Sequence, residues 1–208
     1  MDHQFEQTMA ALHERQRREI ELMHALSDDE REARLDEFML AIGPEAGRFI
    51  NLLIKTAGAH SVLELGTSVG YSTLWMAEAV RSTGGHIISF DPNPDKHRQA
   101  WDHLRAAGLA AHVELRTEDA MEALPHLEGP FDFVLIDLWK RMYVPCFQTL
   151  YPNKLAAGGI VVADNMLYPE SARPRAEEYR KCVHDSPGME TVLVPIGSGL
   201  EFSRRSSE

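Results

Sequence analysis

Two carboxylates in this sequence each follow a short apolar run that reads as a strand. Asp137 follows the run 131–136, and Asp164 and Asn165 follow the run 159–163. If these runs are neighbouring parallel strands, their carboxyl ends meet at one edge of a sheet. Two carboxylates and one amide oxygen suit a hard divalent cation such as Mg²⁺, Mn²⁺ or Ca²⁺. Two unrelated loop caps are the alternative, but that requires two coincidences, so we predict a metal site.

Two further residues after Asp137 have side chains that can take part in chemistry. Lys140 lies three positions later, and a nearby cation lowers the pKa of a lysine because like charge disfavours the ammonium form. We therefore predict Lys140 as the general base beside Asp137, against the alternative of a solvated loop lysine. Trp139 is expected to stack on a bound adenine or to wall the substrate pocket; the alternative is a half-buried packing residue.

A glycine loop lies earlier in the chain, within residues 62–72. The buried-strand pattern of residues 62–65 runs into Gly66, and a helix is predicted to begin near Gly70. Glycine permits a sharp turn and close approach of a ligand, and the helix N-terminus offers free N–H groups to an anionic group. A dinucleotide site needs a further glycine where Ser68 stands, which disfavours NAD. A simple strand-to-helix turn is the alternative.

Two acidic residues are predicted at the same edge of the sheet as the glycine loop. Asp91 follows the run 87–90 and is placed to accept hydrogen bonds from both hydroxyls of a ribose. Its alternative role is a helix cap near residue 94. Asp119 and Ala120 follow the third strand and are candidates for contact with an adenine. Asp119 at the start of the next helix is the alternative.

The pattern of apolar residues predicts how these side chains are positioned. Helices are expected at 3–26, at 27–43 after a capping box of Ser27 and Glu30, and at 44–57 after Pro44. Beyond Gly58, strands at 61–65, 86–90, 112–116, 131–136 and 159–163 alternate with helices at 70–82, 94–107, 119–125 and 142–153. A helix near 171–185 and a hairpin of 191–195 with 200–203 complete the chain.

This alternation predicts an α/β, Rossmann-like, doubly wound sheet of seven strands. The sheet is expected to be mostly parallel, with an antiparallel hairpin at its C-terminal end. Residues 1–57 would form an N-terminal helical cap and residues 58–208 the core, within a single domain of 1–208.

Composition restricts the classes of protein. The 21 basic and 32 acidic residues give a net charge of −11, which argues against a nucleic-acid partner. The two cysteines, Cys146 and Cys182, form no paired motif, as expected in a reducing compartment. No apolar run has the length of a membrane span, and the polar N-terminus does not resemble a signal peptide. We expect a cytoplasmic protein without membrane contact.

Taken together, residues 38–205 resemble the cation-dependent O-methyltransferases, which include catechol O-methyltransferases, caffeoyl-CoA O-methyltransferases and their bacterial relatives. The resemblance is carried by four motifs in order: the glycine loop at 63–72, Asp91, the Asp137, Trp139, Lys140 and Tyr143 set, and residues 163–165. It departs from the family at Leu138, which alters one wall near the cofactor, and at residues 166–170. The latter segment borders the acceptor site, so analogy says least about the substrate.

The resemblance implies a class I enzyme that depends on S-adenosylmethionine (SAM) and on Mg²⁺ or another divalent cation, and often a homodimer. It implies Asp137, Asp164 and Asn165 as metal ligands and Lys140 as general base. The residues expected around SAM are Glu64, Gly66, Thr67, Ser68, Gly70, Tyr71, Ser72, Asp91, Asp119, Ala120, Asp137 and Trp139.

The resulting hypothesis is methyl transfer from SAM to one oxygen of a vicinal diol on a small hydroxylated aromatic molecule. Three alternatives are a methyltransferase for a hydroxylated tRNA base, a non-catalytic SAM-binding interaction protein, and an NAD-linked oxidoreductase. The net charge of −11 opposes the first. The acidic pair with Lys140 opposes the second, and Ser68 in the glycine loop opposes the third.

Overall fold

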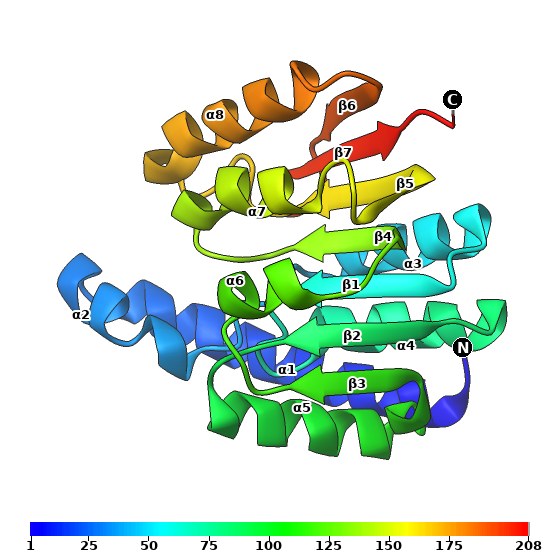
Figure 1. Cartoon of the computed structure of the whole chain (residues 1–208). Coiled ribbons are helices and arrows are strands. Elements are labelled where there is room, and N and C mark those ends of the chain that lie inside the picture. Colours follow the sequence, from blue (N-terminus) through cyan, green and yellow to red (C-terminus); the bar gives the residue numbers. More distant parts are fainter. Residues whose placement is uncertain (208) are drawn as a thin grey trace.

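The computed structural model describes residues 1–207, apart from the side chains of Asp28 and Glu32. It contains one mixed sheet in the order β3-β2-β1-β4-β5-β7-β6 (Figure 1). Strands β1 to β5 are parallel, whereas β7 runs antiparallel to both β5 and β6. The predicted seven-stranded sheet and its antiparallel hairpin are confirmed. The strands are β1 (Ser61–Leu65), β2 (His86–Phe90), β3 (Val113–Arg116), β4 (Phe131–Ile136), β5 (Leu155–Ala163), β6 (Met189–Val194) and β7 (Leu200–Arg205).

Helices cover both faces of the sheet (Figure 1). One apolar cluster joins α1, α3, α4 and α5 to the first face, and a second joins α6, α7 and α8 to the other. The α-helices are α1 (His3–Ala25), α2 (Asp28–Ala33), α3 (Pro44–Ala57), α4 (Tyr71–Thr83), α5 (Pro94–Ala106), α6 (Ala120–Ala123), α7 (Tyr143–Leu150) and α8 (Arg173–His184). Short 3₁₀ turns lie at Leu35–Glu37, Ala110–His112, Leu124–His126, Lys140–Met142 and Glu170–Ala172.

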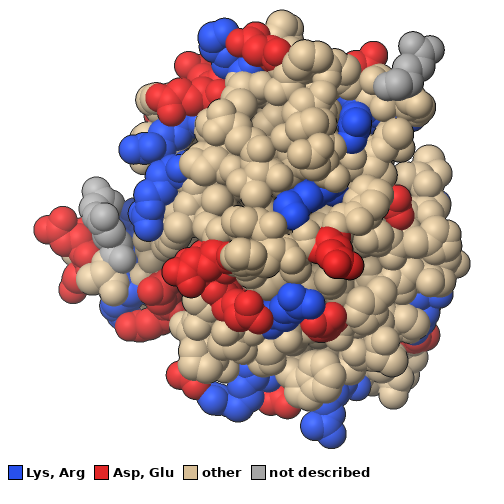
Figure 2. Space-filling view, viewed as in Figure 1, with Lys and Arg blue, Asp and Glu red and all other residues tan. Residues whose placement is uncertain are grey.

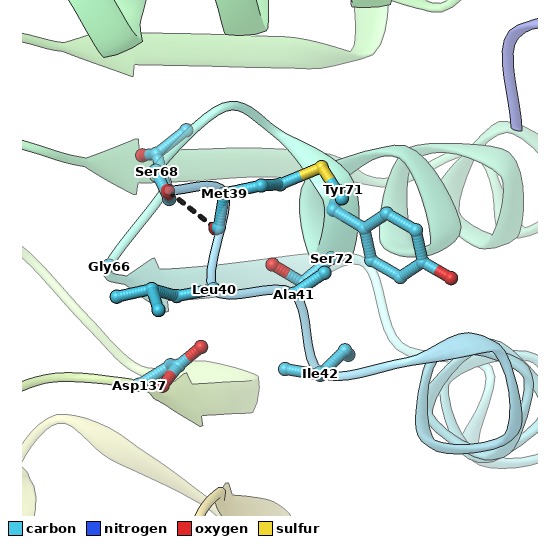
Figure 3. A pocket seen from close by; sticks show the side chains of 10 residues that line it. Met39, Leu40, Ala41, Ile42, Gly66, Ser68, Tyr71, Ser72 and Asp137 are labelled. Carbon is cyan, nitrogen blue, oxygen red and sulfur yellow. Dashed lines mark hydrogen bonds between the residues drawn. The ribbon is translucent and has the colours of Figure 1, made fainter. Parts of the chain in front are cut away.

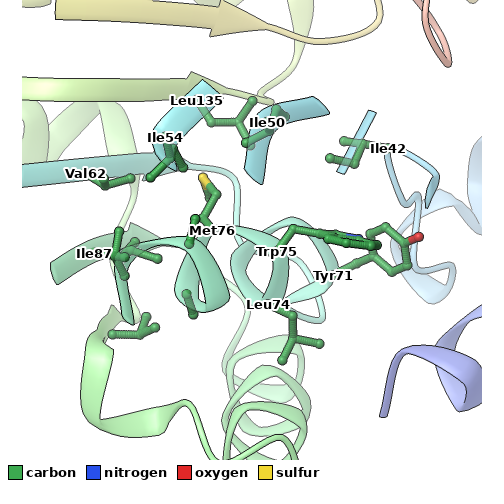
Figure 4. Packing of buried hydrophobic residues seen from close by; sticks show 14 of the residues in the cluster. Ile42, Ile50, Ile54, Val62, Tyr71, Leu74, Trp75, Met76, Ile87 and Leu135 are labelled. Atoms are coloured by element: carbon green, nitrogen blue, oxygen red, sulfur yellow. The ribbon is translucent and has the colours of Figure 1, made fainter. Parts of the chain in front are cut away.

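Helices α3 and α4 pack on β1 and β4 through a layer of buried apolar side chains (Figure 4). Ile50 and Ile54 of α3 meet Met76 of α4, and all three are fully buried. Trp75 lies against α3 so closely that a Cβ on Gly47 would clash with its ring. Interiors packed this densely transmit displacements, so this layer fixes the N-terminus of α4 relative to the end of β1.

The prediction of one helix over 27–43 is wrong. Ser27 and Glu30 do form the expected capping box, with the Ser27 N–H 3.0 Å from Glu30 Oε2, but α2 ends at Ala33. After the 3₁₀ turn, residues 38–43 form a non-helical segment that we call the strap. Phe38 and Met39 are both buried, although the backbone of residues 38–43 is not helical. The strap is therefore held by contacts with other parts of the chain.

Helix α1 has the predicted bounds within two residues, but only its first half packs on the core. Phe5, Met9 and Leu12 are buried, whereas Ile20 is 40% exposed. Within the described residues, none of the helices combines the length and the apolar character needed to cross a membrane.

Candidate active site

The glycine loop joins the end of β1 to α4 and lies directly beside Asp137. Gly66 has a φ of 113°, and a Cβ at this position would clash with the backbone carbonyl oxygen of Asp137. The Asp137 N–H donates to the carbonyl oxygen of Leu65 over 2.9 Å. Only glycine combines this φ with such a close approach. The loop and the acidic pair predicted from sequence are therefore parts of one continuous site.

Glu64 lies beneath the loop rather than on its open side. The side chain is 0% exposed and accepts hydrogen bonds from Ser72 Oγ at 2.5 Å and Thr73 Oγ1 at 2.6 Å. Ser89 Oγ of β2 donates to it over 2.5 Å. Burial nonetheless raises the pKa of Glu64 to about 7, because desolvation outweighs the three hydroxyl donors. The carboxyl group ties β1, β2 and the first turn of α4 together below the loop.

Other loop residues divide between the open side and the interior. Gly66, Thr67, Ser68, Tyr71 and Ser72 all line one small pocket together with Asp137 (Figure 3). Tyr71 is buried, and its hydroxyl lies 2.8 Å from His13 Nε2 of α1. Gly70 adopts a left-handed conformation at the start of α4.

Asp91 follows β2 and is oriented by backbone N–H groups. Its Oδ2 accepts from the Ser68 N–H at 2.8 Å, and its Oδ1 accepts from the Asn93 N–H at 2.9 Å. A carboxylate has about four lone-pair positions, so each oxygen can still accept a further hydrogen bond. The side chain is half-buried, which leaves it accessible to a ligand.

Asp119 caps α6, as the alternative interpretation expected. Its Oδ1 accepts from the Met121 N–H at 2.7 Å and from the Glu122 N–H at 3.3 Å. Ala120, the first residue of α6, is buried. Asp119 and Glu122 also line an open cleft of about 480 Å³.

The acidic pair lies at the ends of two paired strands. Ile136 of β4 is in register with Ala163 of β5, and the Asp164 N–H donates to the Ile136 carbonyl oxygen over 3.1 Å. Asp164 is only 1% exposed, and its Oδ1 has no hydrogen-bond partner within the described part of the chain. The next residue, Asn165, turns the chain with a φ of 55°. A buried carboxylate oxygen without a partner is costly, which makes it a candidate ligand for a cation.

Lys140 and Tyr143 both donate to the Asp164 carbonyl oxygen. The distances are 2.6 Å from Lys140 Nζ and 3.1 Å from Tyr143 Oη. Lys140 Nζ also lies 3.6 Å from the centre of the Tyr143 ring. Trp139 remains 51% exposed at the same edge. Lys140 is therefore held next to Asp164, and Trp139 is free to contact a ligand.

Burial shifts the pKa values of these groups in opposite directions. It raises the pKa of Asp164, and the nearby Asp137 carboxylate raises it further. Burial also raises the pKa of Asp137. It lowers the pKa of Lys140, although the two carboxylates partly oppose this change. All three shifts favour uncharged forms, as expected where charges are kept from water.

Across residues 1–207 there is no cluster of three or more His, Cys, Asp or Glu side chains suited to a metal ion. The predicted ligand set contains only two such residues, since its third member is an asparagine. Its fit to a cation therefore rests on the oxygen donors and on the unpartnered Asp164 Oδ1.

The strap was not predicted as part of the site. Residues Met39, Leu40, Ala41 and Ile42 form one wall of the small pocket at the glycine loop (Figure 3). Ser68 Oγ donates to the Met39 carbonyl oxygen over 3.0 Å. Leu40 has a φ of 49° and is 42% exposed. The one sequence signal is Pro44. A helical conformation is disfavoured for the residue before a proline, so Pro44 indicates that a helix cannot continue through Gly43.

Comparisons with known proteins agree with this geometry. The O-methyltransferase family model matches residues 13–206. The catechol O-methyltransferase of Niastella koreensis is 37% identical over 133 residues, which cover 62% of this chain and 59% of that protein. The match thus spans less than two thirds of the relative's length. The caffeoyl-CoA O-methyltransferase of Petroselinum crispum is 27% identical over 190 residues, which cover 81% of this chain and 78% of that protein.

Solved structures share the fold. An O-methyltransferase from Bacillus cereus, crystallised with SAH, superposes with a TM-score of 0.76 and 22% sequence identity. The superposition covers 99% of this chain and 92% of that one. At this identity the likeness concerns the fold alone, which is the predicted Rossmann-like sheet.

Proposed function

We propose that this chain methylates one oxygen of a vicinal diol on a small aromatic molecule. It belongs to the O-methyltransferase family and is a class I, SAM-dependent O-methyltransferase. The relatives named for catechol and caffeoyl-CoA support this substrate class, since both names describe hydroxylated aromatic compounds. Trp139, two residues after Asp137, and Tyr168, four residues after Asp164, are exposed and supply apolar surface for such a ring.

We propose that SAM binds along the glycine loop. Gly66, Thr67, Ser68, Gly70, Tyr71 and Ser72 would surround its methionine end, near the N-terminus of α4, where free N–H groups favour a carboxylate. Asp91 would accept hydrogen bonds from the ribose, and Asp119, Ala120 and Trp139 would border the adenine. Glu64 would act from below, through the hydroxyls of Ser72 and Thr73.

We propose Asp137, Asp164 and Asn165 as ligands of Mg²⁺ or a similar divalent cation. The observation that carries this proposal is Asp164 Oδ1, which is buried and has no partner in residues 1–207. When bound, such a cation lowers the pKa of a hydroxyl that it contacts and neutralises the buried carboxylates. The adjacent peptide is already fixed, because Lys140 and Tyr143 both donate to the Asp164 carbonyl oxygen.

Lys140 is the proposed general base. Burial lowers the pKa of its ammonium group, so the neutral amine needed to accept a proton is more accessible than in water. In the transfer, the acceptor O–H bond breaks and its proton passes to Lys140 Nζ. When bound, SAM would supply the methyl group: a bond would form between that oxygen and the methyl carbon as the bond from this carbon to sulfur breaks, leaving SAH. Asp137, beside Gly66, would hold the two reactants close to each other.

The direct test is a panel of diphenols assayed for SAH release. The expected result is release from a catechol with Mg²⁺, none after thorough chelation by EDTA, and recovery when Mg²⁺ is added back. Matched phenols with a single hydroxyl serve as the control and should react far more slowly. Turnover of a catechol that survives chelation would remove the metal from the proposal.

We propose three further properties, of which the homodimer rests on the family resemblance, and the single domain and the cytoplasmic location rest on length and composition. Residues 1–208 would work as one domain, as a homodimer, and in the cytoplasm. Acidic and basic side chains both lie along the left edge of the face in Figure 2, and the net charge of the chain is −11. This supports a small molecule rather than a nucleic acid as the acceptor.

A further inference from the structure

Both backbone polar groups of one strap residue, Met39, form hydrogen bonds with other parts of the chain. Its carbonyl oxygen accepts from Ser68 Oγ of the glycine loop over 3.0 Å (Figure 3). Its N–H donates to Glu19 Oε2 of α1 over 2.6 Å. The N-terminal helix and the cofactor loop are therefore connected through one residue of the strap.

Glu19 is itself fixed by a chain of polar contacts. Its Oε1 accepts from Arg15 Nε at 2.6 Å, and Arg15 donates onward to Gln99 Oε1 of α5 at 2.7 Å. The Glu19 side chain is only 17% exposed. One helical turn earlier, Gln16 donates to the Ala41 carbonyl oxygen over 3.3 Å. The same face of α1 thus holds the strap at two points, and α5 holds that face in place.

This connection continues to the proposed ribose site. Ser68, which donates to Met39, also donates its backbone N–H to Asp91 Oδ2 over 2.8 Å. Ser68 has a φ of 46°, a conformation that is uncommon for a residue other than glycine. The hydrogen bonds of Ser68 to Met39 and to Asp91 keep it in this conformation. Displacing the strap would remove the first bond, and Ser68 could then shift away from Asp91.

We propose that Glu19 is a positioning residue of the cofactor site. It holds the strap, which forms one wall of the proposed SAM pocket, although Glu19 does not itself line that pocket. The proposal rests on the proposed function, because it needs SAM in the pocket beside the glycine loop. It makes helix α1 part of the cofactor site, although no motif in α1 suggests this.

The test compares Glu19→Ala with Glu21→Ala, an exposed glutamate on the same helix, by titrating SAH into the full chain. A hydrogen bond to a charged group contributes enough that its loss should weaken SAH binding about 10-fold, and Glu21→Ala should change it less than about 2-fold. KM for SAM should rise in parallel, while kcat at saturating SAM and KM for the acceptor stay near wild type. Glu19→Gln keeps an acceptor oxygen for Met39 and should recover most of the affinity.

Hydrogen exchange separates positioning from a general structural role. In Glu19→Ala, amides of residues 38–43 should exchange faster, while those in the first half of α1 and in α4 keep their protection. SAH affinity equal to wild type, an equal loss in Glu21→Ala, or faster exchange throughout α1 and α4 would overturn the proposal. Wild-type protein that does not bind SAH would instead overturn the cofactor site itself, and the proposal with it.

Discussion

Glu64 of β1 and Asp164, directly after β5, are both buried carboxyl groups, yet their surroundings differ. Glu64 accepts hydrogen bonds from three hydroxyls, those of Ser72, Thr73 and Ser89. Asp164 has an Oδ1 with no partner in the described chain. Hydroxyl groups of the protein therefore satisfy the first carboxyl group, whereas Oδ1 of the second has no such partner in residues 1–207.

This difference in hydrogen bonding distinguishes the half of the site at the glycine loop from the half at Asp137 and Asp164. The half beneath the glycine loop is complete and holds its shape through internal contacts. The half at Asp137 and Asp164 keeps acidic groups close together, and burial raises the pKa values of both. A protein keeps such costly groups where a ligand compensates for them. The predictions below test this contrast, beginning with the largest expected effect.

The largest effect is expected for Asp164→Asn. Removing one proposed metal ligand should lower kcat/KM for a catechol by about 10³-fold or more, because the charge that holds the cation is lost. In chelator-treated protein the same change should leave the melting temperature unchanged or raise it at pH 8, since a buried charge with an unpartnered oxygen is removed. A variant that stays active, or that melts well below wild type without metal, would contradict the assignment.

Lys140→Ala tests the proposed base next to that carboxylate. Loss of a general base should reduce kcat by about 10²- to 10³-fold, with a much smaller change in KM for SAM. Arg141→Ala, at the exposed neighbouring position, is the matched control and should keep most of the activity. Steady-state kinetics with SAM and acceptor varied separately would check this, and unchanged turnover in Lys140→Ala would remove the base assignment.

Unlike Asp164→Asn, Glu64→Leu is expected to lower the stability of the protein even in the absence of metal. The change removes the Glu64 acceptor from the hydroxyls of Ser72, Thr73 and Ser89, although Ser89 Oγ keeps its contact with Thr67 Oγ1. Each hydroxyl left unsatisfied costs about 1–3 kcal/mol before rearrangement. We expect the free energy of unfolding to fall by about 2–4 kcal/mol in urea titrations, even without metal or SAM. Stability close to wild type would mean that Glu64 does not hold the loop.

Dependence on pH gives a smaller and more specific effect at Glu64. Its pKa is raised from 4.5 to about 7 in the folded protein, so between these values the folded state binds more protons than the unfolded state. The contribution of Glu64 to stability is therefore present below about pH 4.5 and is lost as the pH rises to 7. Wild type should lose up to about 3 kcal/mol relative to Glu64→Gln across this range. A difference between the two proteins that does not change with pH would contradict the shift.

The sequence predicted the sheet well because its signals are local. Short apolar runs, Gly66 and Pro44 mark where β1 and α3 begin or end, and the observed bounds agree within a few residues. Asp137 and Asp164 could be brought together from sequence because paired parallel strands end at one edge. These inferences need only the periodicity of each element and the topology of α/β folds.

The strap and the buried position of Glu64 beneath the loop could not be predicted in the same way, because residues distant in the sequence determine them. Met39 leaves the helical pattern where Glu19 and Ser68 bind its backbone groups, 20 and 29 positions away. The hydroxyl donors of Glu64 come from α4 and from β2, 8 to 25 positions away. The only local signal was a charged residue inside a buried strand, which indicates a partner but does not identify it.

Calorimetric titration of Mg²⁺ into chelator-treated protein tests most directly whether Asp164 belongs to a cation site. The account predicts saturable binding of one ion by wild type in the presence of SAH, and no detectable binding by Asp164→Asn, while Glu64→Gln still binds. Absence of Mg²⁺ binding to wild type with SAH present, or equal binding by Asp164→Asn, would contradict it.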